Sequence, residues 1–404
     1  MPGRCTGLCR VRYRVPSRSP NPPASKMGRC WLFLLVFAAV GCQERDFPNY
    51  PANYREYAYI SNGGSNTVTV LDLVNMRQDR VIAVGAGPSG LVVNPRRNEV
   101  YVVNSGSGTV SVINAETNTV AATIRVQRKP YFIDVDTRGE RAYVANSGSN
   151  NVSVLDLARR REIGVIGAGE GPGMARISND GKSVVISNRA SGSVSIADAR
   201  SLQVRSSFDH CPGATDVMIL PDSSKAFITC SAGHQIMVIG LAHSNGSEPR
   251  PADVGLSILD VGQTPVHLAL KPDGGEAFVS NYDSDTISEL TTSTNEVGGA
   301  YLMGTHPVRG LVSADNSLLY VSNFGAGRVI IYGIDDGKRI GEGVKVGEGP
   351  DALAFSSSGH LLLVVDAQSG DIAVVRTANP ASLLTLFPAG RAPNDIVVKA
   401  FLVR

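Results

Sequence analysis

Tryptophan is nearly missing from this 404-residue chain, whose single tryptophan is Trp31. The chain also has no Cys-x-x-Cys-His segment, no Gly-x-Ser-x-Gly segment and no Gly-x-x-x-x-Gly-Lys-Ser/Thr segment. These absences argue against covalently attached haem, a hydrolase nucleophile elbow and a phosphate-binding loop. Repeated tryptophans of the quinoprotein type are absent as well. We therefore expect no cofactor, although a metal held by scattered residues would leave no linear motif.

Charge of one sign is also scarce. The formal net charge is +2, only 18% of the residues are charged, and no long acidic or basic run follows residue 45. The overall charge thus gives no reason to expect nucleic acid or an anionic membrane surface as the main partner.

Long apolar runs are limited to Trp31–Val40, which is too short to span a bilayer comfortably and follows the basic residues Lys26 and Arg29. The run ends in Ala39-Val40-Gly41-Cys42, which resembles the processing box of bacterial lipoproteins. The resemblance implies a signal peptide over residues 27–41, a lipid on Cys42 and a tether over residues 42–55. Residues 1–26 are then an over-extended start or a charged leader, and Met27 is the alternative start.

Two other interpretations remain for this segment, namely an ordinary cleaved signal and an uncleaved anchor. Several acyl chains on one cysteine anchor a protein stably. Gln43 follows the cysteine, and by resemblance to Gram-negative sorting rules it favours the outer membrane, with the protein facing either the periplasm or the outside.

Cysteine is equally sparse after the tether. Of six cysteines, Cys5, Cys9 and Cys30 fall in the segment expected to be removed, and only Cys211 and Cys230 follow Cys42. An even pair in an exported protein is a candidate disulfide.

An internal repeat of about 42 residues fills the rest of the chain. Its marker is a Tyr-Val-x-Asn block followed by a small polar turn and a Val-Ser-Val strand. The eight blocks end at Asn62, Asn104, Asn146, Asn188, Cys230, Asn281, Asn323 and Asp366. One spacing is about nine residues longer than the others, and we place the insertion within Leu241–Ile258.

Each repeat predicts four short strands, because apolar and small polar residues alternate with a period of two and glycine turns separate the segments. A proline suits the first residue of the strand that precedes each block. These prolines are Pro88, Pro130, Pro172, Pro212, Pro265, Pro307, Pro350 and Pro393. Four antiparallel strands per repeat of this length form one blade of a β-propeller.

The two ends of the repeat region predict how the ring closes. The first block, at Tyr59, has no proline strand before it, and the strand after Pro393 has no block after it. Residues 393–399 therefore complete the blade begun by residues 57–84, which protects the edge strands. The prediction is an all-β fold over residues 56–404, a single closed propeller with eight blades, or seven if one copy lies outside the ring.

These blocks resemble the YVTN-type repeats of archaeal surface-layer proteins and of bacterial periplasmic or surface propellers, over roughly residues 55–400. Repeats Tyr101–Asp136 and Tyr143–Ile177 match best, whereas Cys230 and Asp366 depart from the asparagine position. The resemblance implies the fold and says little about activity, since propellers include both binders and enzymes.

Consecutive antiparallel strands bring the start of each proline strand beside the end of each Tyr-Val strand, so one mouth of the ring collects both kinds of loop. Two residues after the prolines stand Gly90, Phe132, Met174, Ala214, His267, Arg309, Ala352 and Asp395. His267, Arg309 and Asp395 are candidates for binding a small anion or a metal, or they are polar residues lining a wet channel. Tyr131, Phe132 and Tyr282 are candidates for gripping a sugar or a peptide.

Two further groups of residues are notable. Asp134, Arg176 and Asp216 each lie four residues after a proline and predict an ion-pair ladder that holds blades in register. His210, Cys211, Cys230 and His234 admit three interpretations: a disulfide, two free thiols, or a zinc or copper site.

Two functions fit the sequence. The first is a monomeric, lipid-anchored module of the cell envelope that binds proteins or glycans without catalysis, through small polar turns and aromatics at the mouth. The second is a metal-dependent hydrolase of the lactonase kind that uses His267 and Asp395.

Overall fold

The computed structural model describes residues 48–243 and 250–403. The chain divides into two compact units, Met1–Pro48 and Asn49–Arg404, and the strands of the described residues belong to the second. The predicted signal peptide, Cys42 and part of the predicted insertion lie outside the described residues. Across the described ranges, no helix is both long enough and apolar enough to cross a membrane.

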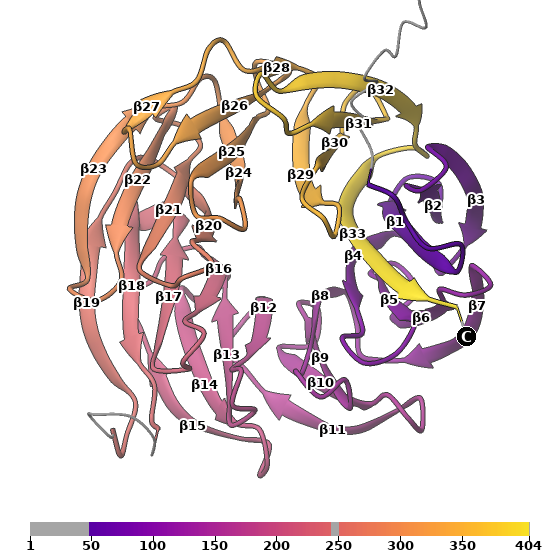
Figure 1. The fold of residues 1–404 in the computed structure, drawn as a ribbon. Helices are drawn as coiled ribbons and strands as arrows, with labels where there is room; N and C mark the ends of the chain where they lie inside the picture. Colours follow the sequence, from indigo (N-terminus) through magenta and orange to yellow (C-terminus); the bar gives the residue numbers. More distant parts are fainter. Residues whose placement is uncertain (1–47, 244–249, 404) are drawn as a thin grey trace, which may run out of the picture. The chain divides into compact units, whose positions relative to one another are not determined.

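The second unit is an eight-bladed β-propeller, in which each blade is an antiparallel sheet of at least four strands (Figure 1). The strands of each blade are given from the innermost to the outermost. Blade 1 holds β33 (Pro393–Leu402), β1 (Tyr54–Asn62), β2 (Thr67–Asp72) and β3 (Arg77–Ala83). Blade 2 holds β4 (Pro88–Val93), β5 (Glu99–Asn104), β6 (Thr109–Asn114) and β7 (Thr119–Arg125). Blade 3 holds β8 (Pro130–Val135), β9 (Arg141–Asn146), β10 (Asn151–Asp156) and β11 (Arg161–Gly167).

The next three blades follow the same order. Blade 4 holds β12 (Pro172–Ile177), β13 (Ser183–Asn188), β14 (Ser193–Asp198) and β15 (Gln203–Phe208). Blade 5 holds β16 (Ala214–Ile219), β17 (Lys225–Cys230), β18 (Gln235–Gly240) and β19 (Val254–Asp260), with a short 3-10 helix η1 (Ser231–Gly233). Blade 6 holds β20 (Pro265–Leu270), β21 (Glu276–Asn281), β22 (Thr286–Thr291) and β23 (Glu296–Leu302).

The last two blades differ in their outer strands. Blade 7 holds β24 (Pro307–Val312), β25 (Leu318–Asn323), β26 (Arg328–Gly333) and an outer strand split into β27 (Lys338–Arg339) and β28 (Val344–Lys345). Blade 8 holds β29 (Pro350–Phe355), β30 (Leu361–Asp366), β31 (Asp371–Arg376) and β32 (Ser382–Pro388).

The ring closes as the sequence predicts. Strand β33 pairs antiparallel with β1, with Ile396 opposite Ile60, and the pairing extends to Leu402 opposite Tyr54. In Figure 1 the last strand runs beside the first one. Eight blades are confirmed, and the seven-bladed alternative is wrong.

The Tyr-Val-x-Asn motif has a local physical reason. The buried Asn104 amide donates to the hydroxyls of Thr109 and Ser111, both at 3.0 Å, which ties the end of β5 to the start of β6. The asparagines of blades 1, 3, 4 and 6 bond in the same way to the residues five and seven positions later. In these five blades the asparagine amide therefore ties the two strands of the hairpin together.

The apolar core lies between neighbouring blades. One cluster joins Tyr59 and Val68 of blade 1 to Val100 and Val102 of blade 2, and seven similar clusters are distributed around the ring. Each fully buried aliphatic side chain contributes roughly 1.5–3 kcal/mol. Blade-to-blade burial therefore stabilises the ring.

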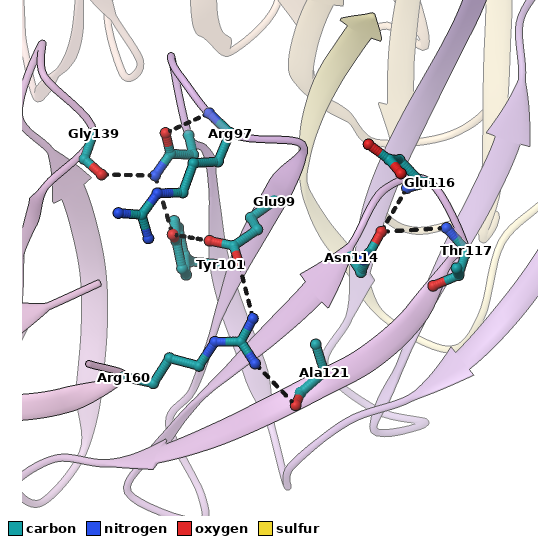
Figure 2. A network of polar contacts seen from close by, with 10 residues as sticks. Arg97, Glu99, Tyr101, Asn114, Glu116, Thr117, Ala121, Gly139 and Arg160 are labelled. Atoms are coloured by element: carbon teal, nitrogen blue, oxygen red, sulfur yellow. Dashed lines mark hydrogen bonds and ion pairs between the residues drawn. The ribbon is translucent and has the colours of Figure 1, made fainter. Parts of the chain in front are cut away.

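A polar network also joins blades 2 and 3 at the end of the strands away from the asparagines (Figure 2). Arg160 donates to Glu99 at 3.0 Å and to the carbonyl of Ala121 at 3.2 Å, and the hydroxyl of Tyr101 donates to Glu99 at 2.6 Å. These bonds fix one end of the junction between the two blades.

The extra residues of the fifth repeat lie between β18 and β19, within the predicted range. His243 and Arg250 form an isolated β-bridge at the base of this segment. Asp253 then makes a two-pronged ion pair with Arg205 of blade 4, with both contacts at 2.8 Å.

Candidate functional site

The inner strands line the axis of the ring, and their third residues lie at one level. In the structure this level carries Gly90, Phe132, Met174, Asp216, His267, Arg309, Ala352 and Asp395. The prediction of Ala214 at this level is wrong, because Ala214 pairs with Cys230 as Pro88 pairs with Asn104. Ala214 therefore takes the place of the proline, and Pro212 lies in the preceding loop.

The same change of register in blade 5 alters the predicted ion-pair ladder of Asp134, Arg176 and Asp216. Asp134 and Arg176 are the fifth residues of their strands, whereas Asp216 is the third residue of β16. Arg176 still approaches Asp216, with 3.9 Å between its Nη2 and Oδ1. The pair is thus a loose contact between two levels.

Three aspartates join the inner strands of neighbouring blades. Asp395 of blade 1 accepts a hydrogen bond from the Leu91 N–H of blade 2 at 3.0 Å. Asp216 of blade 5 accepts one from the Leu268 N–H of blade 6 at 2.9 Å, and Asp134 of blade 3 accepts one from the Ile177 N–H of blade 4 at 3.0 Å. The second oxygen of each carboxylate accepts the N–H of the next residue in its own strand. These carboxylates therefore clamp one blade to the next.

His267 is partly buried at this level. Its side chain is 19% exposed, and burial lowers its pKa to about 4, with Asp216 opposing the shift and Arg309 and Arg176 adding to it. Its Nδ1 accepts a long hydrogen bond of 3.4 Å from the Gly310 N–H. The proton then resides on Nε2, which lies 3.9 Å from Oδ2 of Asp216.

Arg309 provides the positive charge at this level. Burial opposes its charge, but the carboxylates of Asp395, Asp351 and Asp216 outweigh that effect and raise its pKa. Burial raises the pKa of Asp351 and Asp395, and Arg309 opposes both shifts. Nε of Arg309 is buried and has no hydrogen-bond partner among the described residues.

A pocket of about 280 Å³ opens at the mouth above this level. Its lining includes Tyr131, Met174, Asp216, His267 and Arg309, so it spans blades 3 to 7. Tyr131 is 52% exposed. The pocket combines apolar walls with a few charged groups, as small-molecule and peptide sites do.

The predicted mouth residues separate into two groups. Tyr131, His267 and Arg309 line the pocket. Phe132 instead packs under the guanidinium of Arg176, whose Cζ lies 4.9 Å from the centroid of the Phe132 ring. Asp395 joins blade 1 to blade 2.

Tyr282 does not line the mouth pocket either, and its ring stacks on His306 at 4.4 Å.

Sequence reasoning missed Asp216 as a mouth residue. The strict 42-residue spacing from Pro172 to position 214 would have identified it.

Cys211 and Cys230 form a disulfide with a Cα–Cα distance of 4.7 Å. They occupy the positions of a glycine and an asparagine that touch in other blades, where a Cβ added to Gly85 would lie 2.7 Å from the Asn104 side chain. Two cysteines at these positions are therefore close enough to bond.

Because Cys211 and Cys230 are bonded to each other, neither supplies a thiolate for the zinc or copper site that the sequence offered with His210 and His234. His234 accepts a hydrogen bond from the Thr264 N–H at 3.1 Å. Over residues 48–243 and 250–403, no group of three or more His, Cys, Asp or Glu residues is arranged to hold a metal ion.

Comparison with known proteins gives the fold alone. No model of a protein family matches the chain, and no curated protein matches it. One similar solved structure is the dihydro-haem d1 dehydrogenase NirN, with a TM-score of 0.68 and 15% sequence identity to this chain. The match covers 87% of this chain and 76% of the NirN chain. AztD of Citrobacter koseri has a TM-score of 0.65 and 15% identity, covering 87% and 99%.

The periplasmic gluconolactonase PpgL of Pseudomonas aeruginosa is a third similar structure. It has a TM-score of 0.57 and 18% identity, and the match covers 85% of this chain and 98% of that chain. These neighbours support the propeller fold, and the YVTN resemblance remains a prediction.

Proposed function

We propose that this chain is a lipid-anchored β-propeller of the bacterial cell envelope, a monomer that binds a protein or glycan partner at the mouth without catalysing a reaction. The proposal rests mainly on the structural roles of the ionisable side chains that line the channel. Asp134, Asp216 and Asp395 hold neighbouring blades together, and burial lowers the pKa of His267 to about 4. The pocket above them stays open.

The mouth has the features of a binding surface. Tyr131 is half exposed beside the pocket, and Arg309 lies at its base. Tyrosine and arginine dominate the energetics of many protein interfaces. Short polar hairpin tips such as Asn62–Asn66 lie at the same end of the blades and bond to the adjoining junction loops, as the Gly63 and Gly64 N–H groups do to the Ala392 and Arg391 carbonyls.

The lactonase alternative receives less support. It requires His267 and Asp395 to hold a divalent ion, but both carboxylate oxygens of Asp395 accept backbone N–H groups. The guanidinium of Arg309 already supplies positive charge to Asp395. Metal analysis of the purified protein separates the two functions: we expect far less than one metal ion per chain, whereas a stoichiometric metal would favour the hydrolase.

The lipid anchor follows from the Cys42 motif. We expect labelled palmitate to be incorporated into the native protein and to be absent from the Cys42→Ala variant, which should leave the membrane fraction. Incorporation into the variant would exclude Cys42 as the lipidated residue.

Capture of partners from solubilised envelopes tests the binding function. The native protein should capture a partner saturably, and Tyr131→Ala should weaken capture by about tenfold, the loss of roughly one well-placed contact. Leu302→Ala is the matched control, because Leu302 is 72% exposed on the outermost strand of blade 6. Absence of a saturable partner, or equal loss in both variants, contradicts the proposal.

A further inference from the structure

The loops that join the outermost strand of one blade to the innermost strand of the next differ at one junction. Seven of these junction loops carry at most one charged residue in their three central positions, and most begin with glycine. The three central positions are 85–87, 127–129, 169–171, 211–213, 262–264, 304–306, 347–349 and 390–392. Between blades 2 and 3 they are Gln127-Arg128-Lys129, separated by Val126 from Arg125 at the end of β7.

These residues are placed where small ones fit more easily. Lys129 has a φ of 48°, at a position where four blades have glycine and where Thr264, His306 and Ala392 have similar φ values of 49° to 53°. Left-handed backbone costs a residue with a Cβ about 1 kcal/mol. The backbone of this junction is therefore like that of the other junctions, and what distinguishes it is the charge of its side chains.

The three cations line one open groove. It has a volume of about 800 Å³ and lies between the junction loop, the Ser105–Thr109 hairpin tip of blade 2 and Gly148 of blade 3. No acidic residue lines it. In the described ranges, the side chains of Arg125, Arg128 and Lys129 have no hydrogen bond or ion pair, whereas Arg160 and Arg205 are both paired.

Acidic groups near the groove do not neutralise it. Glu162 of β11 accepts a hydrogen bond from the Gln127 amide at 3.1 Å and does not line the groove. Three unpaired like charges around one concavity repel one another and attract an anion.

The backbone that carries these side chains is fixed before any ligand binds. The Gly148 and Ser147 N–H groups donate to the carbonyls of Arg128 and Lys129 at 3.1 and 2.9 Å, and the Arg128 N–H donates to the Ser149 hydroxyl at 3.0 Å. At the other end of the same two blades, the network of Figure 2 holds the junction. A preorganised site loses less entropy on binding.

We propose that this groove binds a sugar carrying anionic groups, a proposal that rests on the protein being a binding module. The Ser105 hydroxyl lies beside the cations and can donate or accept a hydrogen bond. The lining has no aromatic or bulky apolar anchor, which disfavours a protein hot spot and base stacking on nucleic acid.

Calorimetric titration of the native full chain tests this proposal, with oligogalacturonate as the carboxylate probe and glucose 6-phosphate as the phosphate probe. We expect saturable binding of at least one probe, weakened by added salt. The variant R125A/R128A/K129A should bind about tenfold or more weakly, since each lost ionic contact removes attraction. The milder Arg128→Gln variant serves if the triple variant does not fold.

The matched control is R96A/R138A/R200A, which removes the same charge from exposed or partly exposed arginines in loops at the opposite end of the strands. It should bind as the native protein does. The proposal is overturned if both triple variants bind the probe equally weakly, or if the native protein binds neither anionic probe. It is also overturned if neutral maltohexaose binds as well as the anionic probes do, or if a polyglutamate peptide binds more tightly. If Tyr131→Ala does not weaken the capture of envelope partners while the sugar still binds the groove, the result contradicts the proposed binding site at the mouth. It leaves the proposed sugar site in the groove standing.

Discussion

At the end of the second strand, six blades place a buried asparagine, and blades 5 and 8 place Cys230 and Asp366. Asp366 is fully buried, and among the described residues only one of its oxygens has a partner, the Gly347 N–H at 3.0 Å. The residues five and seven positions later are Asp371 and Ala373, so the hydroxyls found in other blades are missing. Burial raises the pKa of Asp366 to about 7, and Asp371 adds to the shift.

Asp366→Asn is therefore expected to stabilise the protein above neutral pH. Because the pKa of Asp366 is raised in the folded state, the native chain binds this proton more tightly, and the free energy of unfolding falls as pH rises from about 4 to about 7. The asparagine variant should lose that decrease and gain about 1–3 kcal/mol at pH 8. Urea unfolding at pH 5 and pH 8 measures both effects.

The control is Asp336→Asn, which makes the same chemical change at an exposed position. It should alter the free energy of unfolding by less than about 0.5 kcal/mol at either pH. A native protein as stable at pH 8 as at pH 5, with no gain in the Asp366 variant, would disprove a proton on this buried carboxyl.

Asp395→Ala should destabilise the ring by about 2–4 kcal/mol, because two backbone N–H groups and the charge of Arg309 lose their partner. Asp395→Asn keeps one acceptor and should cost less. Thermal and urea unfolding of the two variants measure the difference. Equal stability of the alanine variant and the native protein would contradict the clamp.

Among the elements, the strands and their order follow from the period and the alternation, and these predictions are confirmed. The register of the inner strand of blade 5 does not follow from its proline, because Cys211-Pro212-Gly213 replaces the usual glycine loop and moves the proline out of the strand. The mouth contacts of Tyr131 and the packing of Phe132 depend on side-chain directions across blades. A repeat pattern contains no information on those directions.

The junction between blades 4 and 5 should depend on its disulfide. The bond closes a segment with a sequence separation of 19, and a loop of this length contributes about 3 kcal/mol by limiting the unfolded chain. The variant C211A/C230A should lose about that much in urea unfolding under non-reducing conditions. Reductant should lower the stability of the native protein and leave the variant unchanged, and an effect of reductant on both would argue against this bond.

Across the ring, β33 supplies the innermost strand of blade 1, so each of the eight blades has an inner strand, and the aspartate clamps connect inner strands at three of the junctions. A ring fixed in this way offers its mouth as a preformed surface. Binding there requires no rearrangement of the blades, which favours affinity.

Amide hydrogen exchange of the full-length protein, with and without a solubilised envelope extract, tests binding at the mouth most directly. We expect the extract to slow exchange at the mouth, in Tyr131–Phe132 and Gly171–Met174, and to leave the outermost strands β15 and β23 unchanged. Protection confined to the outermost strands, or no protection at any concentration of extract, would contradict the account.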